Sequence, residues 1–274
     1  MSAIAVTGTA GSAPRRIAAV VIRQWYATRR SPHRFLDVAV WPVFDMLLYG
    51  SIAMYVREAG GNTAARTALS VVAGIVMWHV MYQAQIAVSA SFFEEIYARQ
   101  LPSLLTTPLR PVEWVAGAAL QGLIRVGVGV AAVIAAAAIL FSFDITDSGA
   151  AIVPVMVLLL LTGWAVALIV MGVVMCLGSG TETLAFTLMF IVLPLSGAFY
   201  PVSVLPEVIR PISAVLPTTY TFSAARTVAT GDSSPWGEIG VAALATAVLM
   251  AAAFAFATFS LRVFQRRGFI SRYQ

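Results

Sequence analysis

Residues 150–178 read AAIVPVMVLLLLTGWAVALIVMGVVMCLG and contain no charged side chain. A helix needs about 20 predominantly apolar residues to cross the roughly 30 Å hydrocarbon core of a bilayer. Backbone polar groups at that depth must be satisfied within the segment, which a helix achieves by itself. The stretch therefore predicts a transmembrane helix, long enough to tilt or to extend beyond the core.

The composition of the whole chain agrees with this segment. Of 274 residues, 60% are hydrophobic and only 11% are charged, and the mean hydropathy is +0.89. An ordinary soluble domain is about one quarter charged, and disordered chains are poor in apolar residues. We therefore expect an all-α integral membrane protein in which residues 1–274 form a single transmembrane domain.

Six apolar segments have the length of a membrane span. We expect them near residues 36–57, 66–90, 112–141, 150–178, 181–200 and 237–261. An even number of spans places both termini on the same side of the membrane.

A helix lying in the membrane surface is expected ahead of the spans. Residues 1–14 are small and polar and lack the apolar core of a cleaved signal peptide. The pattern from Arg15 to Arg34 is amphipathic, and Pro32 should end the helix. The apolar side is formed by Ile17, Val21, Trp25 and Thr28, and arginines recur on another side at Arg16, Arg23 and Arg30. Residues 1–35 are thus expected to be a tail and an interfacial helix.

The basic residues indicate the orientation. All 17 are arginines. Twelve belong to the N-terminal segment, the loop after the second span and the C-terminus, whereas four fall on the opposite side. Because loops rich in basic residues stay in the cytoplasm, both termini are predicted to be cytoplasmic. Arginines beside apolar spans indicate a lipid surface rather than nucleic acid as the partner.

Two connections are more than simple loops. The cytoplasmic one, 91–111, opens as a helix and is interrupted at Pro102 and Pro108. The outer one, 201–236, contains four prolines between 201 and 217 and is apolar between them, with Ile209, Ile212 and Leu216 at helical spacing. Its pieces are too short to cross a membrane, so we expect re-entrant helices that return to the outer side, with their apolar faces against the bundle.

Several kinds of chemistry are excluded or poorly supported. Without lysine there is no P-loop for ATP and no Schiff base. Cys176 alone excludes internal disulfides and cysteine metal clusters. His33 and His79 fit no metalloprotease motif, and no GxSxG stretch occurs. We therefore predict that the chain is not an enzyme on its own and binds no cofactor or metal.

Two stretches carry recognisable motifs. In the first, the acidic pair Glu94-Glu95 precedes LLTTPLRPVE at 104–113. In the second, LPLSGAFYP at 193–201 is followed by Leu205-Pro206, by LPTTY at 216–220 and by Arg226. In order and spacing, and together with the six spans, these stretches resemble the membrane subunits of type-2 ABC exporters over nearly the whole chain. Many members carry a glycine in the acidic helix where this chain has Ala98-Arg99-Gln100.

The resemblance implies a permease that exports an amphiphile (a lipid, glycolipid or hydrophobic drug) across the plasma membrane of a prokaryote. It also implies a separate ABC ATPase subunit that binds ATP and Mg, and pairing of the chain with itself or with a close paralogue. The residues that would dock on the ATPase are Phe92, Phe93, Glu94, Glu95, Ile96 and Arg99. The residues of an outer gate would be Pro194, Gly197, Tyr200, Pro206, Pro217 and Tyr220. The same interruption at Pro194 and Gly197 also fits a kink with no moving part.

Three ionisable residues fall inside expected spans: Asp45, His79 and Arg125. A charge in hydrocarbon costs roughly 2.5–3.5 kcal/mol or more, so these side chains should face the protein interior or water. They fit an internal Asp45–Arg125 ion pair with a hydrogen-bonded His79. They also fit the alternative function of a proton-coupled secondary transporter. A third alternative, an intramembrane enzyme acting on lipid, has no recognisable nucleophile and base.

Overall fold

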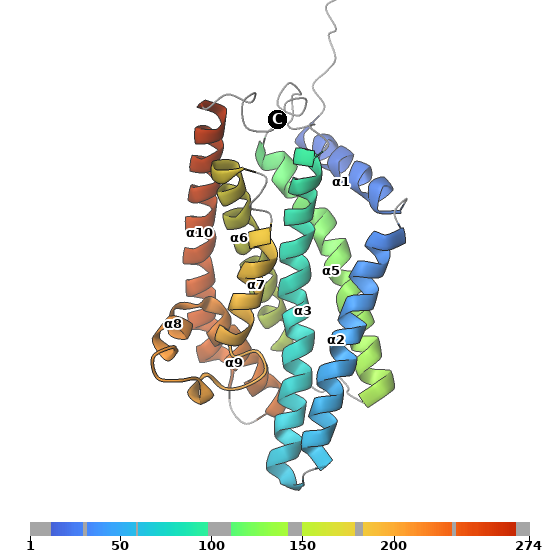
Figure 1. Cartoon of the computed structure of the whole chain (residues 1–274), viewed down its shortest axis with the longest axis vertical. Coiled ribbons are helices and arrows are strands. Elements are labelled where there is room, and N and C mark those ends of the chain that lie inside the picture. The colour runs from blue at the N-terminus through green and yellow to red at the C-terminus, as the bar shows by residue number, and fades with distance from the viewer. Residues whose placement is uncertain are drawn as a thin grey trace, which may run out of the picture.

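The computed structural model describes residues 12–29, 32–58, 60–97, 111–141, 150–178, 183–231 and 234–266, and the regular elements in these ranges are all helical (Figure 1). The longer helices are α1 (Ala13–Arg29), α2 (Pro32–Glu58), α3 (Gly61–Tyr97), α5 (Pro111–Phe141), α6 (Ile152–Leu177) and α10 (Trp236–Arg266). The shorter ones are α7 (Thr183–Leu195), η3 (Val202–Val204), α8 (Arg210–Val215) and α9 (Pro217–Thr230).

Helix α3 forms the centre of the bundle. It packs against α2, α5, α6 and α9, and 83% of its most apolar stretch is buried. Close packing against α6 depends on Gly163, where a Cβ would lie 2.5 Å from the carbonyl oxygen of Met81. By contrast, only 22% of the corresponding stretch of α10 is buried. The outer helices thus expose apolar surface, as a protein surrounded by lipid does.

Four helices are long and apolar enough to cross a membrane. These candidate spans are Thr63–Phe93, Val112–Phe141, Ile152–Leu177 and Trp236–Phe264. They confirm four of the expected segments and a multi-pass membrane protein.

The first and fifth expected spans are not among these four. Helix α2 contains the whole segment 36–57 and is about 40 Å long at 1.5 Å per residue, but its described part includes Asp45, Arg57 and Glu58. Helix α7 has 13 described residues, or about 20 Å, which is less than the hydrocarbon thickness. The expected count of six spans stays a proposal.

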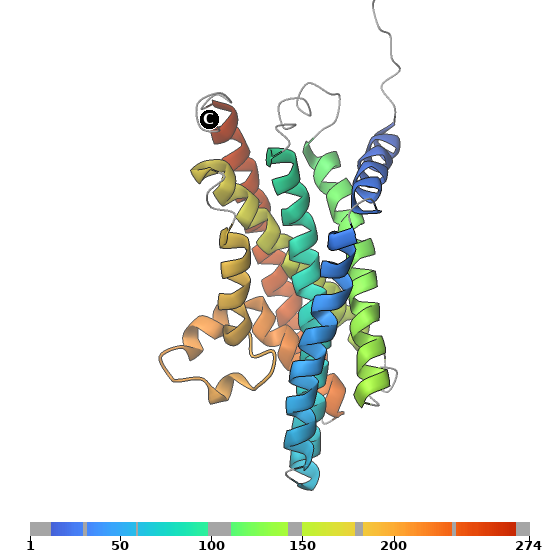
Figure 2. The same ribbon diagram turned by 45° about the vertical axis from the view of Figure 1, so that its right-hand side comes forward.

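The two ends of the bundle differ. Helix α1, the start of α5 and the end of α10 lie at one end, while the α2–α3 hairpin projects at the other (Figures 1 and 2). We call these the α1 end and the hairpin end. The short helices η3, α8 and α9 lie toward the hairpin end, beside the C-terminal end of α7 (Figure 1).

The N-terminal helix agrees with the expectation in position and differs in detail. It ends at Arg29, and α2 begins at Pro32, where proline is favoured because its missing N–H costs nothing at the first helical position. Helix α1 packs on α5 and α2. Val20 and Gln24 are buried and face the bundle. Trp25 is 44% exposed, and Ile22 and Tyr26 are exposed as well. The exposed aromatic side chains give α1 the amphipathic surface of an interfacial helix.

Candidate functional site

The residues SGAFY, 196–200, form a reverse turn at the end of α7, which we call the SGAFY turn. Helix α7 contains Pro194 and ends one residue later, so the expected interruption is a helix end rather than a kink. Gly197 has φ +65°, a left-handed conformation that glycine adopts without steric cost. The Tyr200 hydroxyl donates to the carbonyl of Pro194 at 2.8 Å. The turn is therefore closed on itself by its own residues.

Three other helices hold the SGAFY turn. The ring of Tyr49 on α2 stacks on Phe199, with centroids 4.6 Å apart. On α3, a Cβ built at Gly74 would overlap the carbonyl oxygen of Ala198, so only glycine allows this approach. The Arg226 guanidinium, from α9, donates to the carbonyl oxygens of Gly197 and Tyr200. The turn consequently connects α7 to α2, α3 and α9 at a single point.

Arg226 lies in a partly buried polar group at the start of α10. Burial lowers the pKa of Arg226 below its ordinary value, and the nearby Glu238 carboxylate partly opposes that shift. The side chain stays protonated, because a guanidinium is not deprotonated in proteins. Glu238 also accepts hydrogen bonds from Ser223 at 2.7 Å and Thr227 at 3.1 Å, which ties α9 to α10.

The short helices beyond the turn are closed by bonds from side chain to backbone. Pro217 is buried at the first position of α9, and Tyr220 donates to the carbonyl of Ala214 at 3.0 Å. Arg210 donates to the carbonyls of Leu205 and Ser203. Pro206 is exposed at the start of the turn that leads to α8.

The three apolar residues expected to face the bundle differ in exposure: Ile209 and Leu216 are half-buried, whereas Ile212 is exposed. Ile212 is 57% exposed, and Val208 and Val215 are more exposed still. The buried residue of α8 is Ser213, which accepts a bond from Thr219 through its carbonyl. The expectation that Ile212 is covered by the protein is wrong, because the polar turn contacts occupy the inner face of α8.

The expected docking segment continues α3 instead of forming a separate element. Phe92 is 4% exposed, and its ring meets Trp114 of α5 edge-on, with centroids 6.2 Å apart. Phe93 is half-buried and also packs on the core. Phe92 therefore joins α3 to α5 within the chain. Glu94, Glu95 and Ile96 belong to the last turn of α3, but their side chains, and Arg99 altogether, lie outside the described residues.

An ion pair beside this segment fixes α1. Arg16 donates two hydrogen bonds, of 2.8 and 2.7 Å, to the carboxylate of Glu113 on α5. Hydrogen bonding to Glu113 raises the pKa of Arg16 above its ordinary value. One turn further along α5, Gly117 leaves room for Val20, which would lie 2.7 Å from a Cβ there. The sequence contains both charged residues, but nothing in their spacing indicated the pair.

The intramembrane polar residues are arranged differently from the expected pair. His79 is 1% exposed, and its Nε2 lies 3.4 Å from a carboxylate oxygen of Asp45. Its ring also meets Tyr82 edge-on. Arg125 is half-buried on α5. Among the described residues, the close contact of Asp45 is therefore with His79.

One family of known proteins matches the chain. The family model described as "ABC-2 type transporter" matches residues 15–229, which is most of the chain. No curated protein sequence matches it. The match includes the last turns of α3, the SGAFY turn and α9.

Proposed function

The chain belongs to the ABC-2 type transporter family, and from this premise we propose that it is the permease subunit of an ATP-driven exporter. One structural observation supports the proposal in addition to the family match. Helix α3 is continuous over 37 residues, about 55 Å, from the hairpin end to Tyr97. The same helix carries Gly74, which receives the SGAFY turn, and the acidic pair expected to dock on an ATPase.

A rigid helix with both features provides mechanical coupling. A displacement applied to Glu94 and Glu95 moves α3 as a body, because α3 has no break between them and Gly74. That displacement changes the contact between Gly74 and the carbonyl of Ala198. We propose that the SGAFY turn is the gate that this motion opens, in a cycle of alternating access.

The site that binds ATP must be on a partner subunit. The sequence contains no lysine, so it cannot supply the P-loop lysine that reaches the nucleotide phosphates. We propose a separate ABC ATPase subunit that holds ATP and Mg, and two copies of this chain in the complex.

The proposed cargo is an amphiphile (a lipid, glycolipid or hydrophobic drug) moved across the plasma membrane of a prokaryote. The proposed topology has six spans and both termini in the cytoplasm, which places the hairpin end outside. There the exposed side chains of Val208, Ile212 and Val215 suit the lipid surface.

The test reverses charge at the docking segment. The double variant Glu94→Arg, Glu95→Arg should lower both co-purification of the ATPase and ATP-dependent transport, because complementary charges guide such an interface. Glu207→Arg, at an exposed position of the hairpin end, is the matched control and should keep both. Normal ATPase binding and transport in the double variant, at equal expression, would contradict the proposal.

A proton-coupled transporter is the second candidate, and the contact between His79 and Asp45 is the observation that favours it. Histidine changes charge near neutral pH, and buried pairs of this kind serve in proton relays. Proteoliposomes that contain only this chain separate the two candidates. Transport driven by a pH gradient without ATPase and ATP, and lost in His79→Gln, would replace the exporter with the proton-coupled transporter.

A further inference from the structure

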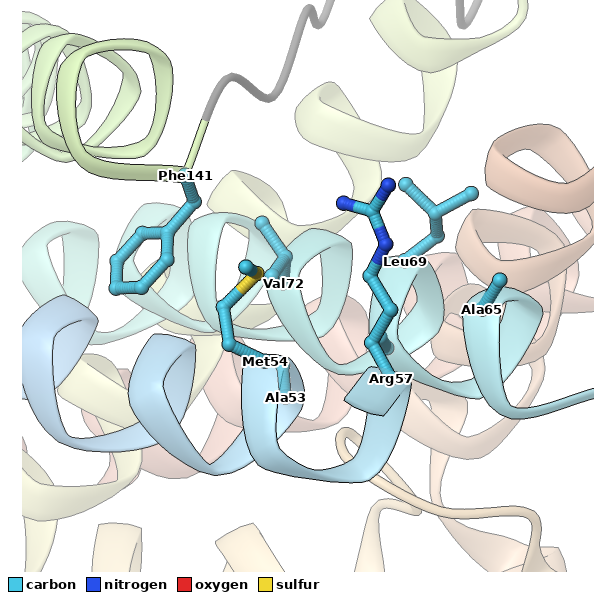
Figure 3. A pocket seen from close by; sticks show the side chains of 8 residues that line it. Ala53, Met54, Arg57, Ala65, Leu69, Val72 and Phe141 are labelled. Atoms are coloured by element: carbon cyan, nitrogen blue, oxygen red, sulfur yellow. The ribbon is translucent and has the colours of Figure 1, made fainter. Parts of the chain in front are cut away.

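A cavity of about 260 Å³ opens at the hairpin end (Figure 3). Its lining comes from three helices: Ala53, Met54 and Arg57 of α2, Ala65, Ala68, Leu69 and Val72 of α3, and Phe141 of α5. Apart from Arg57 these side chains are apolar. Ligand sites for drug-sized molecules have about 300–1,000 Å³, so this cavity has room for one slender apolar group.

Small side chains create the cavity. Ala53 and Ala68 are 1% and 6% exposed at the interface of α2 and α3, where larger residues would fill the space. Phe141 forms the opposite wall. Its ring lies over Gly50, since a Cβ at that position would overlap three ring carbons. The cavity therefore results from small side chains packed between helices rather than from a gap between loops.

Arg57 places a positive charge at the edge of this apolar cavity. In Figure 3 its side chain extends from the end of α2 on the same side as Leu69. Arg57 is exposed, and its guanidinium forms no hydrogen bond or ion pair with a described residue. Five N–H donors are therefore available to a ligand, in the planar arrangement that suits a phosphate.

The depth of the cavity matches one leaflet of a bilayer. The candidate span of α3 begins at Thr63, and the lining residues of α3 fall between Ala65 and Val72. At 1.5 Å per residue, Val72 lies about 14 Å along the span from Thr63. The lining residues of α3 therefore fall within about half of the hydrocarbon core. Arg57 precedes the span, at the level where headgroups lie and where arginine side chains reach out of the hydrocarbon.

We propose that this cavity binds a lipid with an anionic phosphate headgroup. One acyl chain occupies the apolar space between α2, α3 and Phe141, and the phosphate accepts hydrogen bonds from Arg57. Charge complementarity selects an anionic over a zwitterionic lipid, because a choline or ethanolamine group brings a second positive charge near the guanidinium. The site does not depend on the export function proposed above.

Photo-crosslinking of the purified full-length chain in detergent tests this proposal. The probe is phosphatidylglycerol with a diazirine on one acyl chain, and phosphatidylcholine with the same chains is the comparison. Mass spectrometry of peptides should locate the phosphatidylglycerol adducts on residues 53–72, with weaker labelling by phosphatidylcholine. Arg57→Gln should reduce phosphatidylglycerol labelling about fivefold, which corresponds to roughly 1 kcal/mol for one arginine at an anionic surface.

Matched variants separate a built site from general attraction. Ala65→Leu, at a half-buried position of the lining, should reduce labelling by both lipids, whereas Ala243→Leu on the exposed face of α10 should not. Arg66→Gln removes a charge from the same hairpin outside the lining and should leave labelling unchanged. Arg57→Gln, at an exposed residue, carries the test if Ala65→Leu does not fold.

Three results would overturn the proposal. Adducts spread evenly over the exposed faces of the helices would mean nonspecific contact. Equal losses in Arg57→Gln and Arg66→Gln would mean general electrostatic attraction. Displacement of the lipid by millimolar inorganic phosphate alone would assign the site to a free anion.

Discussion

Gly74 shows how a single residue determines where the SGAFY turn lies. Its missing Cβ lets the carbonyl of Ala198 sit directly on α3. The same helix bundle contains a glycine without such a role, since nothing lies within 4 Å of a Cβ at Gly127. Comparing the two positions separates the packing effect from helix propensity.

Gly74→Ala should lower the melting temperature of the purified chain, because a methyl group there overlaps backbone and α3 must move away from the turn. Gly127→Ala should leave it unchanged or raise it, since alanine favours a helix over glycine by about 0.5–1 kcal/mol. Thermal unfolding in detergent, followed by size-exclusion chromatography, measures both. Equal melting temperatures for the two variants would mean that the turn tolerates displacement.

Arg226 is the second residue on which the turn depends. Arg226→Met keeps much of the side-chain volume and removes the donors to the carbonyls of Gly197 and Tyr200. Leaving these partly buried carbonyls without donors should lower the free energy of unfolding by about 1–3 kcal/mol. The control is Arg210→Met, which removes bonds to exposed backbone within its own loop and should cost less. Thermal unfolding compares the two, and a loss in Arg210→Met as large as in Arg226→Met would contradict this ranking.

At the scale of elements, α1 is attached to α5 by one buried charge. Glu113 is 7% exposed, and removing Arg16 would take away two hydrogen bonds to its carboxylate. Arg16→Glu and Glu113→Arg should each destabilise the packing of α1, because like charges then face each other. The double variant should recover stability, since the pair is restored with reversed polarity.

A double-mutant cycle on melting temperature measures this coupling, because residues in contact give non-additive effects. The double variant should melt above both single variants. A double variant that shows only the sum of the two losses would mean that α1 is held by apolar contacts such as that of Val20 with Gly117.

The helical elements were largely predictable from the sequence. Apolar runs of 20 or more residues predicted α3, α5, α6 and α10, because the bilayer imposes that length. A helix after Ser91 was predicted, but not that it would continue α3 without a break through Tyr97. The first proline after Ser91 is Pro102, so nothing in the sequence ends the helix where the span ends. The outward apolar face of α8 was also missed, since helical spacing indicates an apolar face but not what covers it.

Contacts between residues far apart in the chain could not be predicted from the sequence, and the reason is physical. Pro194 and Gly197 indicated an interruption of the fifth expected span, but the stacking of Tyr49 on Phe199 depends on how α2 and α7 lie in space. The same holds for the pairing of Asp45 with His79 and of Arg16 with Glu113. A charged side chain can pair with many residues, and an aromatic ring can stack on many others. The packing of the helices decides which of these residues lies close enough.

The whole molecule has two ends that must face opposite sides of the membrane if the bundle spans it. At the α1 end lie Arg15, Arg16 and Arg23 of α1 and Arg262 and Arg266 of α10, and the short helices lie toward the hairpin end (Figure 2). Single cysteines in a Cys176→Ala background test this arrangement in intact cells. Glu207→Cys and Arg262→Cys both replace exposed side chains, so each should react wherever an impermeant thiol reagent reaches it.

Glu207→Cys should be labelled in intact cells, whereas Arg262→Cys should be labelled only after the membrane is opened. The reason is that arginine-rich segments are retained in the cytoplasm and the end of α10 lies at the same end of the bundle as α1 (Figure 1). Labelling of both variants in opened membranes is the control for reactivity. The reverse pattern would invert the orientation and place the hairpin end in the cytoplasm. Labelling of both positions from outside would mean that the bundle does not separate its two ends across the bilayer, and a gate at the SGAFY turn would then have no membrane barrier to open.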